Sequence, residues 1–256
     1  MAERLWQTNI KQSRLINLGV ERYASHYAET TIYGAENVEA IKELLIQKTP
    51  VQLYPNHLSH ADGPVLAIEF KKMSPEVAKK LRFVMGSVIR GNLLTYILMH
   101  AYNGLVIPSQ RRKPDSSEGW QVRELQIETA DRAAEKTLKV GNVLVNFAEA
   151  SRSRERKMVK VDNKIARYFY FVPNTHLVPV GIWGTESVLP PEKTLALHGE
   201  VFLNIGQPIS VRELEERIGK SSSKDENDQR LVDALMREVA KLIPEEYQGY
   251  YELPRS

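Results

Sequence analysis

Short apolar segments alternate with helical segments along most of this chain, and that alternation constrains the fold more than any other feature. Residues 143–147 (VLVNF) form an unbroken apolar run, which is typical of a strand covered on both faces of a sheet. Further strands are expected at residues 30–34, 51–54, 82–86, 104–108, 176–183 and 200–206. Helices are expected at residues 4–29, 36–47, 64–72, 93–101, 118–139, 211–218 and 228–242. The alternation predicts an α/β sandwich: a central mixed, largely parallel sheet flanked by helices, with a helix at the N-terminus.

The length and composition predict one α/β domain. A chain of 256 residues with 42% hydrophobic content can bury one sizeable core. No internal repeat and no linker interrupts it. We therefore expect an N-terminal helical segment at residues 1–29 and an α/β domain at residues 30–256. The polar stretch at residues 221–227 is the one segment expected to be mobile.

Charge and residue usage exclude several classes of function. The formal net charge of +3 is too small to predict a nucleic-acid partner, and none is expected, although a basic face would suit phosphate groups or anionic lipid. The chain has no cysteine, which excludes disulfides, thiolate metal sites and a cysteine nucleophile. Charges interrupt residues 1–20, so they do not form a secretory signal. The charge-free run at residues 92–110 contains Asn103, Gly104 and Pro108, and we interpret it as a buried helix, a turn and a strand rather than a membrane span.

The stretch NHLSHADG, at residues 56–63, holds the densest group of chemically active side chains. Metallo-hydrolases of the β-lactamase type use a His-x-His-x-Asp-His pattern, but Leu58 and Gly63 occupy two of the ligand positions here. His57 and His60 alone are a weak zinc signal, because no cysteine and few other histidines remain to complete a ligand shell. No metal site is expected.

An acid–base pair is the second interpretation of this stretch. His57 follows a buried strand, where α/β sheets place their ligand sites, and Asp62 lies where a helix should begin. If the loop folds back, an ionised Asp62 can hold one imidazole nitrogen and make the other a proton acceptor near neutral pH. The spacing also allows a simpler arrangement, in which Asp62 caps its helix and His57 is a loop residue. His60 is expected to take no part.

Four blocks in order resemble the glycerolipid acyltransferases, the glycerol-3-phosphate and 1-acylglycerol-3-phosphate acyltransferases. NHLSHAD matches the family's N-H-x4-D block, and GLVIPSQRR resembles its second block, a Gly-led strand that ends in a basic residue. FAEASRS is similar to the third block, F-P-E-G-T-R-S, and LVPVGI to the fourth. The chain's ending, IPEEYQGYY, also resembles family members. Together the blocks cover residues 50–210.

The resemblance implies an enzyme that moves a fatty acyl group from a thioester, on coenzyme A or acyl-carrier protein, to the hydroxyl of a lysophosphatidate-like acceptor. His57 would be the general base and Asp62 its partner, with no cofactor. With no cysteine and no G-x-S-x-G elbow, we expect direct attack without an acyl-enzyme. The sequence does not identify the donors that stabilise the oxyanion, and backbone N–H groups near the His57 loop are the expected ones. One alternative is an acyltransferase whose acceptor is glycerol 3-phosphate or a non-phosphate compound. The other is a non-catalytic module on the same fold that binds lipid or acyl-carrier protein.

The same resemblance implies an acceptor site rich in arginine. The implied substrate-binding residues are Asn56, Arg111, Arg112, Glu149, Ser151 and Arg152. Arginine binds phosphate through a planar fork of donors, and both basic groups follow strands expected to end near His57. Three positions depart from the family pattern: Gln110 stands where one alignment puts the basic residue, and Ala150 and Ser151 stand where glycine and threonine are common.

The lipid product implies contact with a membrane. We expect a cytoplasmic enzyme bound peripherally at the inner face of the cell membrane, in contact with a phospholipid acceptor. The N-terminal helix is the candidate surface, since it carries Trp6, Tyr23 and Tyr27 together with Lys11 and Arg14. Two other apolar stretches, at residues 92–102 and 166–173, are expected to pack in the core instead.

Overall fold

The computed structural model describes residues 13–86, 97, 101–102, 104–108, 116–150, 155–190, 197–219 and 223–253. The strands are β1 (Ala28–Tyr33), β2 (Val51–Pro55), β3 (Leu81–Gly86), β4 (Gly104–Ile107), β5 (Val143–Val145), β6 (His176–Trp183), β7 (Gly199–Ile205) and β8 (Ile209–Ser210). The α-helices are α1 (Arg14–Tyr27), α2 (Asn37–Ile46), α3 (Asp62–Met73), α4 (Pro75–Ala78), α6 (Ser117–Lys139), α7 (Thr185–Val188), α8 (Val211–Ile218), α9 (Lys224–Ala240) and α10 (Glu245–Gln248). Two 3-10 helices are η3 (Asn163–Tyr170) and η4 (Gly249–Tyr251).

One sheet of eight strands organises the described residues, in the order β1-β7-β6-β2-β5-β3-β4, with β8 beside β6. From β6 to β4 the neighbouring strands are all parallel. β7 and β8 run antiparallel to β6, and β1 runs parallel to β7. The predicted mixed, largely parallel sheet is confirmed. Parallel neighbours end at the same edge of a sheet, so the loops that follow β6, β2 and β5 meet there.

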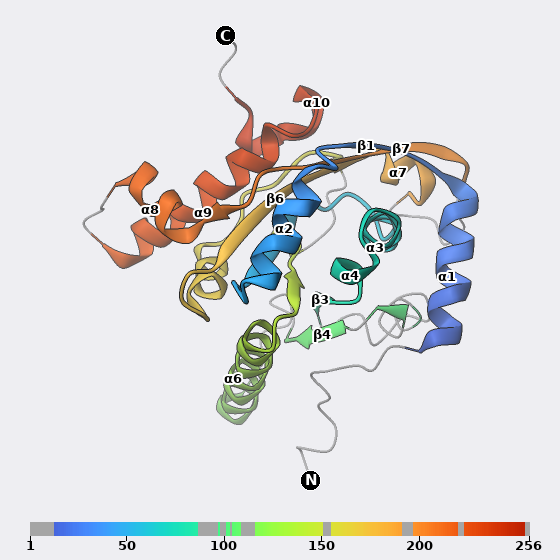
Figure 1. Ribbon diagram of the computed structural model, residues 1–256. Coiled ribbons are helices and arrows are strands. Elements are labelled where there is room, and N and C mark those ends of the chain that lie inside the picture. The colour runs from blue at the N-terminus through green and yellow to red at the C-terminus, as the bar shows by residue number, and fades with distance from the viewer. Residues whose placement is uncertain are drawn as a thin grey trace.

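Helices cover both faces of the sheet, as Figure 1 shows. The first core contains α2, α3 and α4, packed on side chains such as Leu53 of β2 and Val145 of β5. The second contains η3, α8 and α9, packed on Tyr54 of β2 and Leu144 of β5. Successive strand residues point to opposite faces, so burial on both sides explains why β5 is apolar throughout and why every residue of β2 is buried. The one amide side chain of β2, Gln52, donates to the backbone oxygen of Tyr168.

The expected elements are present, with differences at their ends. α1 provides the N-terminal helix over its described part, and the boundary placed at residue 29 stays a prediction. The aromatic stretch in η3 packs in the core as expected, with Tyr168 and Phe169 buried. The helix expected at residues 93–101 lies almost wholly outside the described residues.

The largest difference concerns the polar stretch before α9. We expected residues 221–227 to be mobile and the helix to begin at residue 228, but α9 begins at Lys224. The hydroxyl of Ser223 accepts a hydrogen bond from the backbone N–H of Glu226, at 3.2 Å. A serine followed three residues later by glutamate is a helix-start signal, and here it outweighs the polarity of the segment.

No helix among the described residues is both long enough and apolar enough to cross a bilayer.

Candidate active site

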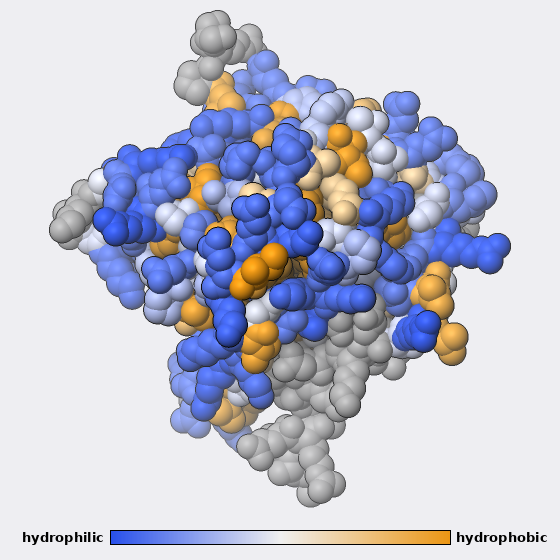
Figure 2. Space-filling view, in the orientation of Figure 1, coloured by the Kyte–Doolittle hydropathy of each residue, from blue (hydrophilic) through white to orange (hydrophobic). Residues whose placement is uncertain are grey.

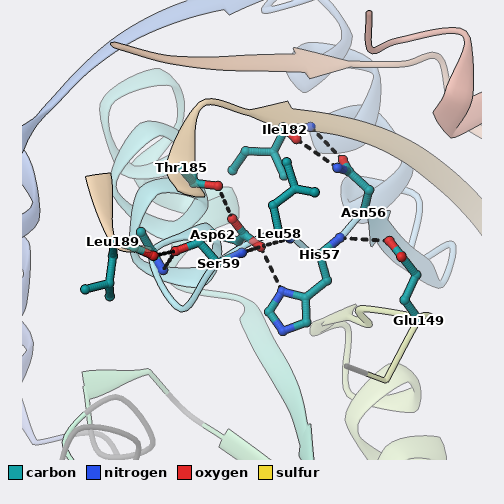
Figure 3. A network of polar contacts seen from close by, with 10 residues as sticks. Asn56, His57, Leu58, Ser59, Asp62, Glu149, Ile182, Thr185 and Leu189 are labelled. Atoms are coloured by element: carbon teal, nitrogen blue, oxygen red, sulfur yellow. Dashed lines mark hydrogen bonds and ion pairs between the residues drawn. The ribbon is translucent and has the colours of Figure 1, made fainter. Parts of the chain in front are cut away.

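Three loops meet at the carboxyl edge of the sheet and bring distant parts of the chain together. Residues 56–61 follow β2, residues 146–150 follow β5, and Gly184 links β6 to α7. β2 lies between β5 and β6, with Leu53 beside Val145 on one side and Val178 on the other. This register, rather than any sequence proximity, brings Asp62, Glu149 and Thr185 to a common site (Figure 3).

The imidazole of His57 is held by the carboxylate of Asp62. Nδ1 of His57 lies 2.7 Å from Oδ2 of Asp62. The Asp62 side chain is fully buried, whereas the His57 side chain is 19% exposed. An ionised Asp62 accepts from Nδ1–H, which leaves the lone pair of Nε2 as the acceptor on the ring. The contact that the spacing left open is therefore present, in the geometry that acid–base chemistry needs.

Asp62 also organises the backbone of the loop that carries His57. Oδ2 accepts from the backbone N–H groups of Leu58, at 2.7 Å, and Ser59, at 2.9 Å. Oδ1 accepts from the hydroxyl of Thr185 in α7. Asp62 is the first residue of α3 and makes no capping hydrogen bond to it, so the helix-cap interpretation is wrong. Asp62 accepts from backbone N–H groups of the folded-back loop, whereas a capping side chain would accept from backbone N–H groups of the helix.

Asn56 and Ser59 also bond this loop to the backbone of β6 and of the residue after α7. The side-chain amide of Asn56 donates to the backbone oxygen of Ile182, at 2.8 Å, and accepts from its N–H, at 2.8 Å. Asn56 is fully buried. The hydroxyl of Ser59 donates to the backbone oxygen of Leu189, at 2.6 Å. Asn56 thus continues the pairing of β2 with β6 beyond the end of the strand.

Glu149 joins the His57 loop to the segment after β5. Oε1 accepts from the backbone N–H of His57, at 2.9 Å, and Oε2 from that of Val159, at 3.0 Å. Burial raises the pKa of this carboxyl to about 7; the two N–H groups oppose the rise, and the nearby Asp62 carboxylate adds to it. Phe147 packs against the imidazole, with ring centroids 4.4 Å apart.

Comparison with known proteins identifies the family. A family model described as Acyltransferase matches residues 29–183, which is more than half of the chain. This chain belongs to the acyltransferase family. Its fold is similar to a crystal structure described as the 1-acyl-sn-glycerophosphate (LPA) acyltransferase, PlsC, from Thermotoga maritima, with a TM-score of 0.53 and 18% identity. The match covers 88% of this chain and 79% of that one. No curated protein sequence matches the chain.

The acyltransferase holds three of the predicted site residues together, His57, Asp62 and Glu149. Asn56 is beside them, but both polar atoms of its amide are bonded to the backbone of β6. Arg111, Arg112, Ser151 and Arg152 lie outside the described residues, so their roles stay predictions.

The strand order separates the two strands that precede the predicted arginine groups. Arg111 and Arg112 follow β4, which lies three strands from β2, or about 14 Å across the sheet. Arg152 follows β5, which is the direct neighbour of β2. The expectation that both strands end near His57 is thus met by β5 only.

Most backbone N–H groups of the His57 loop itself already have acceptors within the protein. The N–H of His57 bonds to Glu149, and those of Leu58 and Ser59 bond to Asp62. The N–H of Ala61 bonds to the hydroxyl of Ser59, and that of Asp62 to the backbone oxygen of Ser59. These five N–H groups hold the loop in place, and oxyanion donors near the loop stay a prediction.

Thr185 is the residue of this site that sequence reasoning missed. Its only sequence signal is a hydroxyl side chain directly after a buried strand and a glycine, and that signal does not name a partner 123 residues away.

Ala150 shows a second feature of the site. Its φ is +55°, a conformation that favours glycine, although alanine occupies the position in this chain. Among the described residues, no group of three His, Asp or Glu side chains is placed to hold a metal ion.

We predict that Thr185→Val destabilises the protein. Valine keeps the shape of threonine but leaves Oδ1 of the buried Asp62 without its donor, which should lower the free energy of unfolding by about 1–3 kcal/mol. Chemical denaturation measures this. Thr185→Ser is the matched control, because it keeps the hydroxyl. A Val variant as stable as the wild type would contradict the assigned bond.

We predict that Glu149 makes folding stability depend on pH. Its pKa is raised from 4.5 to about 7 in the folded protein, so between these values the folded state holds a proton that the unfolded state has lost. Stability should therefore fall by up to about 3 kcal/mol as pH rises from 4.5 through 7. Denaturation curves across this range compare the wild type with Glu149→Gln, whose side chain does not titrate. Parallel curves for the two proteins would show that Glu149 is not responsible.

Proposed function

We propose that the acyltransferase moves a fatty acyl group from a thioester, on coenzyme A or acyl-carrier protein, to the hydroxyl of a lysophosphatidate-like acceptor. The observation that carries the proposal is the contact between the partly exposed ring of His57 and the fully buried carboxylate of Asp62. A hydroxyl is a weak nucleophile until its proton is removed as it attacks. The base therefore has to be oriented, neutral before attack and stabilised once protonated.

The reaction proceeds by direct attack. Nε2 of His57 takes the proton of the acceptor hydroxyl while the oxygen bonds to the thioester carbon. Asp62 stabilises the imidazolium that forms. The tetrahedral intermediate then collapses, the carbon–sulfur bond breaks, and the thiolate receives the proton from His57. No acyl-enzyme is formed, because the chain has no cysteine and no serine in a nucleophile elbow.

The acceptor assignment rests on charge and on family resemblance. A phosphate group needs fixed cations near the base, and Arg152 and Ser151 follow β5, the strand beside β2. Arg111 and Arg112 would contact a more distant part of the acceptor or donor. Glu149 keeps the His57 loop in place, and Asn56 supports the same loop from β6. The family and the similar crystal structure support acyl transfer generally, and glycerol 3-phosphate remains the second candidate acceptor.

We predict that His57→Ala abolishes acyl transfer while the protein stays folded. Removal of a general base should lower kcat by about 10²–10⁴-fold. Thiol release is measured with a chromogenic disulfide, and the absence of cysteine from the chain removes any protein background. His60→Ala, three residues away in the same loop, is the matched control and should stay within about twofold of the wild type.

The same assay compares donors and acceptors. Lysophosphatidate, glycerol 3-phosphate and an uncharged monoacylglycerol are each offered with acyl-CoA and with acyl-carrier protein. Preference for lysophosphatidate supports the proposal, and preference for either other acceptor would replace it. A wild type that binds acyl-CoA without turnover, unaffected by His57→Ala, would instead indicate a non-catalytic binding module.

We propose in addition that the enzyme contacts the cytoplasmic face of the membrane peripherally, through its N-terminal helix. Leu15 and Leu18 of α1 are 83% and 51% exposed. Figure 2 shows that the face drawn is mostly hydrophilic, with apolar residues in small separate groups, including one over α1 at the right. Arg14 and Arg22 of the same helix carry the positive charge that anionic headgroups attract.

We predict that the protein sediments with anionic liposomes and that Leu15→Ser combined with Leu18→Ser weakens this binding severalfold. Each serine removes apolar surface that would enter the interface. Ile46→Ser is the matched control, since Ile46 of α2 is 71% exposed on a different helix. Recovery of the wild type in the supernatant, or equal loss of binding in the control, would refute contact through α1.

A further inference from the structure

The carboxyl-terminal segment, Tyr247 to Tyr251, contacts the backbone of Met158. The backbone N–H of Met158 donates to the oxygen of Tyr247, at 2.8 Å, and the N–H of Tyr250 donates to the oxygen of Met158, at 3.0 Å. Met158 is buried. Two backbone bonds to one residue fix the path of the chain at this point.

Gly249 allows the two segments to approach this closely. Its φ is +54°, and a Cβ atom added there would lie 2.3 Å from the backbone oxygen of Met158 and 2.9 Å from Cβ of Lys157. Both obstacles are parts of the chain that cannot rotate away. Any side chain at this position would therefore displace Met158 or the segment itself.

The carboxyl-terminal segment is itself anchored to α9 and to the chain that follows it. The hydroxyl of Tyr251 donates to Asp233 of α9, at 3.2 Å, and accepts from the N–H of Val161, at 3.0 Å. The side-chain amide of Gln248 donates to the backbone oxygens of Ala240 and Ile243. Residues 158–161 are thus bonded to an element that belongs to the second core.

Val159 connects this arrangement to the active site. Its N–H donates to Oε2 of Glu149, and Oε1 of the same carboxylate accepts from the N–H of His57. Glu149 is 7% exposed, so water does not readily replace either bond. A continuous series of contacts therefore runs from α9 through Tyr251 and Gly249 to Met158 and Val159, and from there to Glu149 and His57.

We propose that the carboxyl-terminal segment is a positioning element for His57, with Gly249 and Tyr251 as positioning residues that act through Val159 and Glu149. The inference rests on the proposed function, since it treats His57 as the base. A displacement of the base by about 1 Å can reduce turnover about a hundredfold without changing substrate affinity. The segment should therefore affect kcat and leave the KM for the acyl donor unchanged.

The test compares Gly249→Ala with Gly141→Ala. Gly141, after α6, also has a positive φ, of +77°, but nothing lies within 4 Å of an added Cβ, so it isolates backbone strain from displacement of Met158. We expect Gly249→Ala to lower kcat at least tenfold at unchanged donor KM, and Gly141→Ala to stay within about twofold. Equal kcat for Gly249→Ala and the wild type would overturn the proposal.

A double-mutant cycle separates positioning from general destabilisation. Glutamine at position 149 has one acceptor oxygen, so Glu149→Gln loses the bond to His57 or the bond to Val159, and either loss interrupts the series. Gly249→Ala should then have little further effect on kcat in the Glu149→Gln background. Multiplicative effects of the two substitutions would mean that the carboxyl-terminal segment does not act through Glu149.

Amide hydrogen exchange gives a readout that does not depend on activity. Gly249→Ala should speed exchange at both His57 and Val159, whereas a purely local effect would speed it at Val159 alone and refute the proposal. If Gly249→Ala does not fold, Tyr251→Phe keeps the ring and removes the hydroxyl, which accepts from Val161 and donates to Asp233, and the same result is expected. A wild type without acyl transfer would refute the proposed function, while the exchange result would still decide whether the segment holds His57.

Discussion

A single buried carboxylate holds the active-site loop of this acyltransferase. Asp62 accepts from the imidazole of His57, two backbone N–H groups and the hydroxyl of Thr185, and it has no exposed surface. An ionised carboxylate is stable in such a place only when its lone pairs are occupied by donors. The dependence is mutual. The loop is held in its folded-back path by bonds to the carboxylate, and the buried carboxylate depends on the loop for its hydrogen-bond donors. The orientation of His57 follows from that mutual dependence.

The parallel sheet makes this arrangement possible. Because β6, β2 and β5 are neighbours that run in one direction, the residues after each strand reach the same edge. Thr185 follows one neighbour and Glu149 follows the other, so the loop that carries His57 is supported from both sides. Glu149 then extends the support to Val159 and the carboxyl-terminal segment. The site is therefore the meeting point of both cores of the protein, although His57 itself lies on a six-residue loop.

Local patterns predicted much of this structure. Apolar runs located the strands, and the position of Asp62 before Gly63 and Pro64 located the start of α3 to within two residues. Polarity misled at residues 224–227, where a serine cap starts a helix that composition alone would exclude. The sequence also did not show which backbone N–H groups of the His57 loop have acceptors within the protein. Backbone N–H groups look equally available in a sequence, and only the fold reveals that Asp62 and Glu149 have taken them.

The order of residues along the chain was sufficient to establish the α/β class and the family resemblance, because both depend on local apolar patterns and short motifs. It placed His57 and Asp62 five residues apart but left open whether they touch. The strand order, the bond from Thr185 to Asp62 and the bond from His57 to Glu149 depend on packing between distant segments, and the two bonds join residues 123 and 92 positions apart in the chain. Such contacts form only when the sheet assembles and buries both of its faces. Local sequence preferences do not determine which strands become neighbours in the sheet. Only the three-dimensional arrangement therefore decides which groups surround His57.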